Sequence, residues 1–223
     1  MSIPHTRACC LLPAVVAVSL LPAAVGVAYP SGDFQVWNTD TIEMKALPAL
    51  KVAAEAEFRR GDDAMEFFYQ HYDGGILWTA SPLLSMGAGY RHVMERKNGD
   101  FRSEFEPYAT LTLSASLLGA TFETRSRQEF RHFTWAADSW RYRNRTAVKF
   151  PSLFGLKPYL ADEILVGFGT VPCQLVQNRI NPGFGFPILG PLSGELYYML
   201  VNTRNGTKWP RVHVLGIKAK VSF

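Results

Sequence analysis

Charged residues recur at every second position in the middle of the chain. They alternate with apolar or small polar residues, and arginine predominates among them. The set is Glu123, Arg125, Arg127, Glu129 and Arg131, followed by Arg141, Arg143 and Arg145. Guanidinium groups form strong, often bidentate, bonds with carboxylates and other anions. This spacing predicts either a network of ion pairs or a positively charged wall that favours anions.

Hydrolytic chemistry has less support in the sequence. Beyond the first 28 residues the histidines are His71, His92, His132 and His213, and none stands in a recognisable Ser/His/acid constellation. No His/Cys cluster has the spacing of metal ligands. We therefore expect no catalytic residues, no metal and no cofactor. A histidine and a serine on different strands can still meet in space, so a lipid-modifying enzyme stays as an alternative.

The elements that carry these charges alternate with a period of two from Leu50 onward. Leu50, Val52 and Ala54 fall on one side of such a segment, and Lys51 and Glu55 fall on the other. Successive side chains of a β-strand point to opposite faces, so each segment has one apolar and one polar face. No helix, linker or domain boundary is evident, and we expect residues 29–223 to form one all-β domain.

The first residues predict that the mature chain lies outside the cytoplasm, whereas the overall composition resembles that of a soluble protein. The 223 residues are 48% hydrophobic and 19% charged, and the net charge of +4 is too small to predict nucleic-acid binding. Residues 1–28 have a basic start, an apolar stretch from Leu11 to Leu21 and small residues at Gly26 and Ala28. This order is typical of a secretory signal peptide cleaved after Sec export. An uncleaved helical anchor is the alternative, but Pro13 and Pro22 interrupt the stretch.

The breaks between segments predict a barrel. Short breaks near 46–48, 81–82, 117–119, 151–155 and 189–191 alternate with longer, more polar ones near 60–63, 96–100, 135–138, 169–172 and 203–207. Short turns at one end and longer loops at the other are typical of outer-membrane β-barrels. A soluble, lipocalin-like barrel alternates too, with its apolar face inside. Several segments exceed the length of about 5–6 residues usual in globular strands, which favours the transmembrane alternative.

The last residues resemble an assembly signal of bacterial outer-membrane barrels. Apolar residues alternate up to a terminal phenylalanine, as Leu215, Ile217, Ala219, Val221 and Phe223. We expect the barrel-assembly machinery and the lipid bilayer to be the partners of the chain. The predicted fold is a transmembrane, antiparallel, up-and-down β-barrel of about 10–12 strands. The number depends on residues 33–46, because ten segments follow Leu50 and an eleventh would break the usual even count.

Scattered motifs add a family resemblance. They are Phe34-Gln-Val-Trp37, Gly89-Tyr-Arg91, Glu104-Phe-Glu106, Arg125-Ser-Arg-Gln-Glu129, Trp140-Arg-Tyr-Arg-Asn-Arg145, Asp162-Glu163, Asn178-Arg179 and Tyr197-Tyr-Met199. In this order they resemble the DUF2490 family of predicted bacterial outer-membrane barrels. The resemblance implies location and fold over nearly the whole mature chain, and it implies no activity. Asp162 departs from the pattern, because strict alternation puts it on the lipid side unless a bulge near Pro158 re-aims it.

If the apolar faces meet lipid, the polar faces line the interior. The expected lining residues are Arg91, Arg102, Glu104, Glu106, Glu123, Arg125, Arg127, Glu129, Arg131, Arg141, Arg143, Arg145, Lys149, Glu163 and Arg179. Two functions fit this lining. The interior is either a narrow passive pore for small, anionic solutes, or a salt-bridge network that closes a non-conducting barrel with a structural or interaction role.

Overall fold

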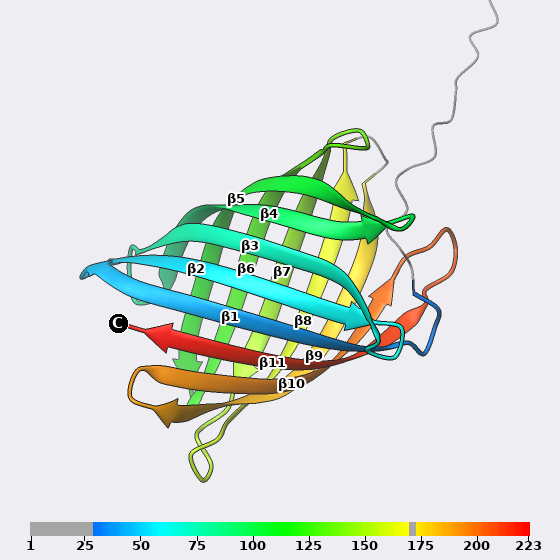
Figure 1. The fold of residues 1–223 in the computed structure, drawn as a ribbon. Coiled ribbons are helices and arrows are strands. Elements are labelled where there is room, and N and C mark those ends of the chain that lie inside the picture. Colours follow the sequence, from blue (N-terminus) through cyan, green and yellow to red (C-terminus); the bar gives the residue numbers. More distant parts are fainter. Residues whose placement is uncertain (1–28, 170–172) are drawn as a thin grey trace, which may run out of the picture.

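The computed structural model describes residues 29–169 and 173–223, and these form eleven β-strands (Figure 1). The expected signal peptide, residues 1–28, lies outside the described residues. The strands are β1 (Phe34–Leu47), β2 (Leu50–Gly61), β3 (Glu66–Thr79), β4 (Leu84–Lys97), β5 (Asp100–Leu117), β6 (Ala120–Phe133), β7 (Ser139–Lys149), β8 (Lys157–Phe168), β9 (Gln174–Leu189), β10 (Leu192–Thr203) and β11 (Arg211–Ser222).

The strands close into one barrel, as predicted, but one seam differs from expectation. Each strand from β1 to β11 pairs antiparallel with its neighbours in sequence, whereas β1 pairs parallel with β11. The register of this seam runs from Phe34 opposite His213 to Glu43 opposite Ser222. The prediction of an entirely antiparallel barrel is therefore wrong. Strand direction alternates along a meander, so an odd number of strands leaves the first and the last pointing the same way.

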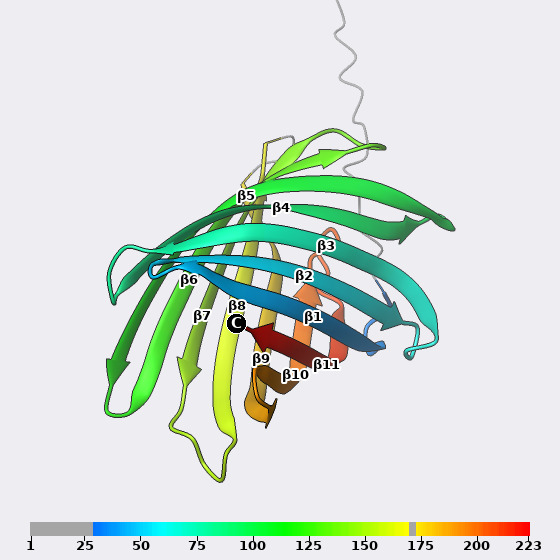
Figure 2. The same cartoon turned by 60° about the vertical axis from the view of Figure 1, so that its left-hand side comes forward.

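The parallel seam shows that the segment before Leu50 is a strand of the barrel. This segment is β1, and it belongs to the wall, so the strand number lies inside the expected range. After the turn of the view in Figure 2, the end of β11 still lies beside β1. Lys45 N and Phe223 N donate hydrogen bonds across this seam, to Phe223 O and Glu43 O. We call the barrel end where β11 finishes the C-terminal rim and the opposite end the N-terminal rim.

Two connections depart from the expected division into short turns at one end and longer loops at the other. Residues 96–100, predicted to be a longer loop, contain a tight turn at Asn98 and Gly99, whose φ angles are 54° and 92°. A positive φ at both central residues is the signature of a type I′ hairpin turn. Residues 151–155, predicted to be tight, lie in the longest connection of the C-terminal rim, between β7 and β8.

The barrel wall is largely apolar outside and largely polar inside. Outward side chains on widely separated strands remain exposed, among them Ile42, Leu111, Leu160 and Ile217. Inward charged side chains are buried, including Glu57, Arg91, Glu104, Glu106, Glu129 and Glu163. This is the reverse of a soluble, lipocalin-like barrel, which keeps its apolar face inside.

Part of the interior is apolar, which the sequence did not predict. The side chains of Trp37, Tyr159, Tyr197, Met199, Val201, Val212 and Val214 form a buried cluster inside the wall. Most of them come from β10, β11 and β1, whereas the charged residues come mainly from β2 to β9. The interior is therefore divided into an apolar wall beside the seam and a charged wall facing it.

The residues before β1 cover part of the N-terminal rim. The ring of Tyr29 packs edge-on against Phe68, with the ring centres 4.7 Å apart. Burial raises the pKa of the Tyr29 hydroxyl. Asp33 fixes this segment by accepting hydrogen bonds from the Gln35 side chain and from the backbone of Asp63.

Candidate functional site

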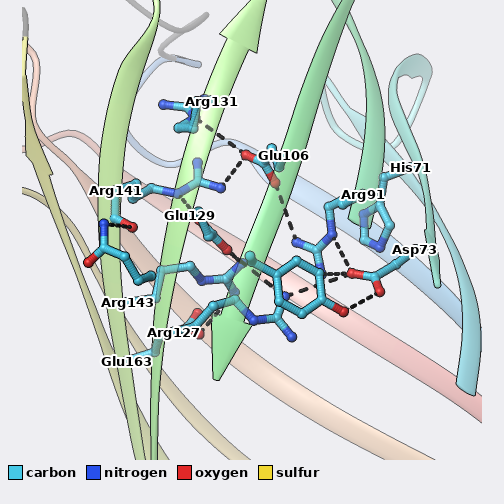
Figure 3. Close-up of polar contacts among 12 residues, drawn as sticks. His71, Asp73, Arg91, Glu106, Arg127, Glu129, Arg131, Arg141, Arg143 and Glu163 are labelled. Atoms are coloured by element: carbon cyan, nitrogen blue, oxygen red, sulfur yellow. Dashed lines mark hydrogen bonds and ion pairs between the residues drawn. The ribbon is translucent and has the colours of Figure 1, made fainter. Parts of the chain in front are cut away.

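The charged wall contains a continuous network of ion pairs (Figure 3). Its main members come from seven strands, β3 to β9, and contacts continue to Glu55 on β2. Each strand contributes side chains at alternate positions, because only every second residue faces the interior. The members are Asp73, Arg91, Glu104, Glu106, Arg127, Glu129, Arg131, Arg141, Arg143, Glu163 and Arg179.

Two glutamates form the centre of the network. The side chains of Glu106 and Glu129 are 2% and 0% exposed. Arg141 joins them, since its Nη2 lies 2.5 Å from Glu106 Oε1 and its Nε donates to Glu129 Oε2. Arg143 also donates to Glu129, at 3.1 Å. Buried carboxylates are tolerated when charged partners and hydrogen bonds replace water, and both glutamates meet that condition.

One arm of the network runs from this centre to β8 and β9. The two oxygens of Glu163 accept hydrogen bonds from Arg143 at 2.9 Å and from Arg179 at 3.0 Å. The side chain of Glu163 is 9% exposed and those of both arginines are 12% exposed. Glu163 therefore ties the centre to the strands that adjoin the apolar wall.

The other arm runs to β3 and β2. Arg91 lies 2.9 Å from Asp73, and Tyr108 donates its hydroxyl hydrogen to the same carboxylate at 2.6 Å. His71, which is 1% exposed, contacts Tyr69 OH at 3.1 Å and Glu55 at 3.2 Å through its two ring nitrogens. The interior polar groups of this arm are thus also satisfied by one another.

A family model described as a protein of unknown function (DUF2490) matches residues 34–211. The chain belongs to the DUF2490 family. The match extends from the start of β1 to the first residue of β11, so it covers nearly all of the wall. Comparisons with curated proteins and with solved structures find no match to the chain.

Most of the expected lining residues meet in the network of this DUF2490 protein. Five lie outside it, namely Arg102, Glu123, Arg125, Arg145 and Lys149. Lys149 pairs with Glu123 at 2.7 Å near the C-terminal rim, where the lysine side chain is 48% exposed. Arg102 lies at the other rim, 3.5 Å from Asp100. Arg125 and Arg145 face the interior, and within the described residues no carboxylate oxygen lies within 4.0 Å of either guanidinium group.

Sequence reasoning missed the contribution of β3. Asp73 and His71 are as buried as the predicted members, and the sequence predicts a segment between the breaks near 60–63 and 81–82, but its inward side chains are not among the expected lining residues. Glycines at 74 and 75 obscure its apolar face, and the pairing with β2 shifts register between Arg59 and Arg60. The spacing of Tyr69, His71 and Asp73 at every second residue was the available signal.

The outer face of the DUF2490 barrel carries a polar band across β6 to β9. Asp162 is exposed on this face and accepts a 2.7 Å hydrogen bond from Asn178. Asn144 on β7 donates a 3.1 Å hydrogen bond to Ser126 on β6. The suggested bulge near Pro158 is absent, because β8 and β9 pair without interruption from Lys157 to Leu165. Asp162 therefore keeps the outward orientation that strict alternation gives it.

One serine and one histidine do meet, on the outer face of β4 and β5. His92 Nε2 lies 3.2 Å from Ser103 Oγ, and Phe105 stacks on the imidazole. In the described part of the chain no carboxylate pairs with this histidine, so the third member of a triad is absent there.

The described residues contain no group of three or more metal-binding side chains. No helix among them is long and apolar enough to cross a membrane.

Proposed function

We propose that the protein is a bacterial outer-membrane β-barrel that does not conduct solutes, because its interior is closed by the Arg/Glu network. We propose no enzymatic activity for it. In this proposal the lipid bilayer and, during biogenesis, the barrel-assembly machinery are its partners. Its role is structural or lies in interactions made by its rims and outer wall.

The distribution of side chains supports the membrane location. Monomeric soluble proteins seldom expose contiguous apolar patches above a few hundred Å². Here exposed Leu, Ile, Phe, Trp and Tyr side chains occur on the outer face of strands all around the barrel. A transmembrane strand needs about 9–11 residues, and the strands contain between 11 and 18.

The burial of Glu106 and Glu129 carries the proposal of a closed interior. Both lie in the middle of their strands and point inward, yet their side chains are 2% and 0% exposed. An open pore would bring water to the charged groups that line it. Arg141 and Arg143, which bond these carboxylates, are themselves only 14% and 12% exposed. In this proposal a solute would have to break several ion pairs to pass.

Two experiments test the proposal. Membrane fractionation after expression in a Gram-negative bacterium should recover the protein in the outer membrane, in a form whose gel mobility changes on heating. Planar-bilayer recordings of the purified protein should show no discrete conductance steps. Recovery in the soluble periplasmic fraction would contradict the location, and stepwise currents would contradict closure.

A narrow anion pore is the second candidate. Arg125 and Arg145 favour it, because these inward cations have no carboxylate within 4.0 Å among the described residues. Stepwise currents carried mainly by anions would support this candidate, and Arg125→Glu would then reduce the preference for anions.

A further inference from the structure

Arginines lie directly opposite each other on the inner faces of β6 and β7. The register places Arg125 opposite Arg145 and, at the next inward position, Arg127 opposite Arg143. Like charges at opposed positions destabilise a sheet. A sequence that places four arginines in this arrangement needs negative charge close by.

Of these four arginines, only Arg143 forms short ion pairs with the carboxylates of the network. Arg143 bonds Glu129 and Glu163, and both of these glutamates also bond a second arginine. Arg127 approaches Asp73 and Glu129 only to 3.8 and 3.9 Å, and its buried Nε has no hydrogen-bond partner among the described residues. Arg125 and Arg145 have no carboxylate within 4.0 Å in that part of the chain. Three guanidinium groups therefore have bonding capacity left over.

Two tyrosines orient two of these three groups, those of Arg127 and Arg145. The guanidinium carbon of Arg127 lies 3.9 Å from the ring centre of Tyr108, and that of Arg145 lies 5.7 Å from the ring centre of Tyr159. The hydroxyls of both tyrosines are held by carboxylates, Asp73 and Glu195 respectively, each at 2.6 Å. A guanidinium that lies over a ring keeps its N–H groups in its own plane, free to donate to a ligand at its edge.

We propose that Arg125, Arg127 and Arg145 bind a tetrahedral oxyanion, such as phosphate or sulfate, inside the barrel. The three residues lie on the C-terminal-rim side of Glu129, because β6 and β7 carry them between Glu129 and that rim. Arg125 and Arg145 are partly exposed, and in this proposal the ion enters from this rim. A doubly charged anion accepts several charge-assisted hydrogen bonds and offsets the opposed arginines. The ion does not have to pass the ion-pair network to reach this site, so the site is compatible with a closed interior.

Isothermal titration calorimetry of the purified, detergent-solubilised protein tests the site. Sodium phosphate and sodium sulfate should each give a saturable binding heat, and sodium chloride at the same ionic strength should give none. Arg125→Gln and Arg145→Gln should each weaken phosphate binding about tenfold or more, the loss expected for one charge-assisted hydrogen bond. Arg102→Gln is the matched control, since it removes an arginine at the other rim and should leave binding unchanged.

Thermal unfolding gives an independent readout that separates binding from folding. At the same phosphate concentration, the melting temperature of the unsubstituted protein should rise more than that of Arg125→Gln. Without phosphate, Arg125→Gln should melt at the same temperature or higher, because it relieves the repulsion with Arg145. Arg145→Lys keeps the charge and loses the planar fork, so it should weaken binding while the barrel still folds.

Two results would overturn the site. The first is the absence of saturable phosphate or sulfate binding by protein that migrates as a folded barrel. The second is binding of normal strength by both glutamine variants. Titration with glycerol phosphate distinguishes two sources of the ligand. Binding as tight as that of phosphate indicates a phosphorylated headgroup or solute, and binding of the inorganic ions alone indicates a free ion.

Discussion

The ring of Tyr197 on β10 lies across the backbone of Gly216, its register partner on β11. A Cβ at Gly216 would lie 1.8 Å from the ring carbon Cζ, so no other residue fits without moving the ring. Tyr197 is 4% exposed and belongs to the apolar cluster beside the seam. The missing side chain of Gly216 leaves the space that the Tyr197 ring occupies. Aromatic side chains commonly cover a glycine on a neighbouring strand in this way.

Replacing this glycine should destabilise the barrel. We expect Gly216→Ala to lower the free energy of unfolding by about 1–3 kcal/mol, the usual cost of an overpacked core position. Urea unfolding of the protein in lipid vesicles measures the change. Gly74→Ala is the control, because a Cβ there meets nothing within 4 Å. Equal effects of the two substitutions would show that the contact with Tyr197 is not the cause.

Removing a central carboxylate should destabilise the interior strongly. Glu129→Gln leaves Arg141 and Arg143 with one charged partner fewer in a buried site. Breaking a buried pair in this way costs about 3–5 kcal/mol. Glu123→Gln breaks the exposed pair with Lys149 and should cost about 0–1 kcal/mol. Unfolding in vesicles compares the two variants, and similar losses would contradict the distinct role of the buried centre.

The outward carboxylate of Asp162 tests the membrane location. Removing a charge from the lipid-facing wall should stabilise a membrane barrel, by less than the cost of about 2–4 kcal/mol known for a lipid-facing Arg or Lys. We therefore expect Asp162→Asn to raise the free energy of unfolding in vesicles. The new amide oxygen can still accept the hydrogen bond from Asn178, so only the charge is lost. Asp40, exposed on β1 and bonded by Asn38, should respond in the same direction. Loss of stability in both variants would count against a lipid-facing position.

The last residue should matter for assembly rather than for the stability of the interior. Phe223 is 71% exposed and lies on the outward side with Ile217. We expect Phe223→Ala to reduce the fraction of heat-modifiable protein in the outer membrane. Phe154→Ala is the control, because Phe154 is 96% exposed in the connection after β7. Normal assembly of the Phe223 variant would contradict the proposed assembly signal.

The faces of β6 and β7 could be predicted from the sequence, and their partners could not. Alternation shows that Arg141 and Arg143 share the charged face of β7 and that Glu129 lies on the charged face of β6, because strand side chains alternate strictly. The bond between Arg141 and Glu106 depends on the register of β5, β6 and β7. A shift of two residues would preserve every face and change every partner. No local pattern fixes that shift.

The apolar wall escaped prediction for a different reason. The middle of β10 reads Leu196, Tyr197, Tyr198, Met199, Leu200 and Val201, so both faces are apolar and alternation is lost. Only the closed barrel shows that Tyr197, Met199 and Val201 point inward and pack on Trp37 and Val214. The parallel seam is likewise a property of closure, since it arises where the first strand meets the last.

The sequence by itself determined that the chain is built of long alternating strands and which side chains share a face, because a period of two is a property of the extended backbone. The tertiary structure decided which charges neutralise one another and which stay without a partner. Arg143 has two carboxylates, whereas Arg125 and Arg145 have none within 4.0 Å among the described residues. All three follow the same spacing in the sequence. They differ because register, closure and the position of each glutamate across the barrel set the distance between charges.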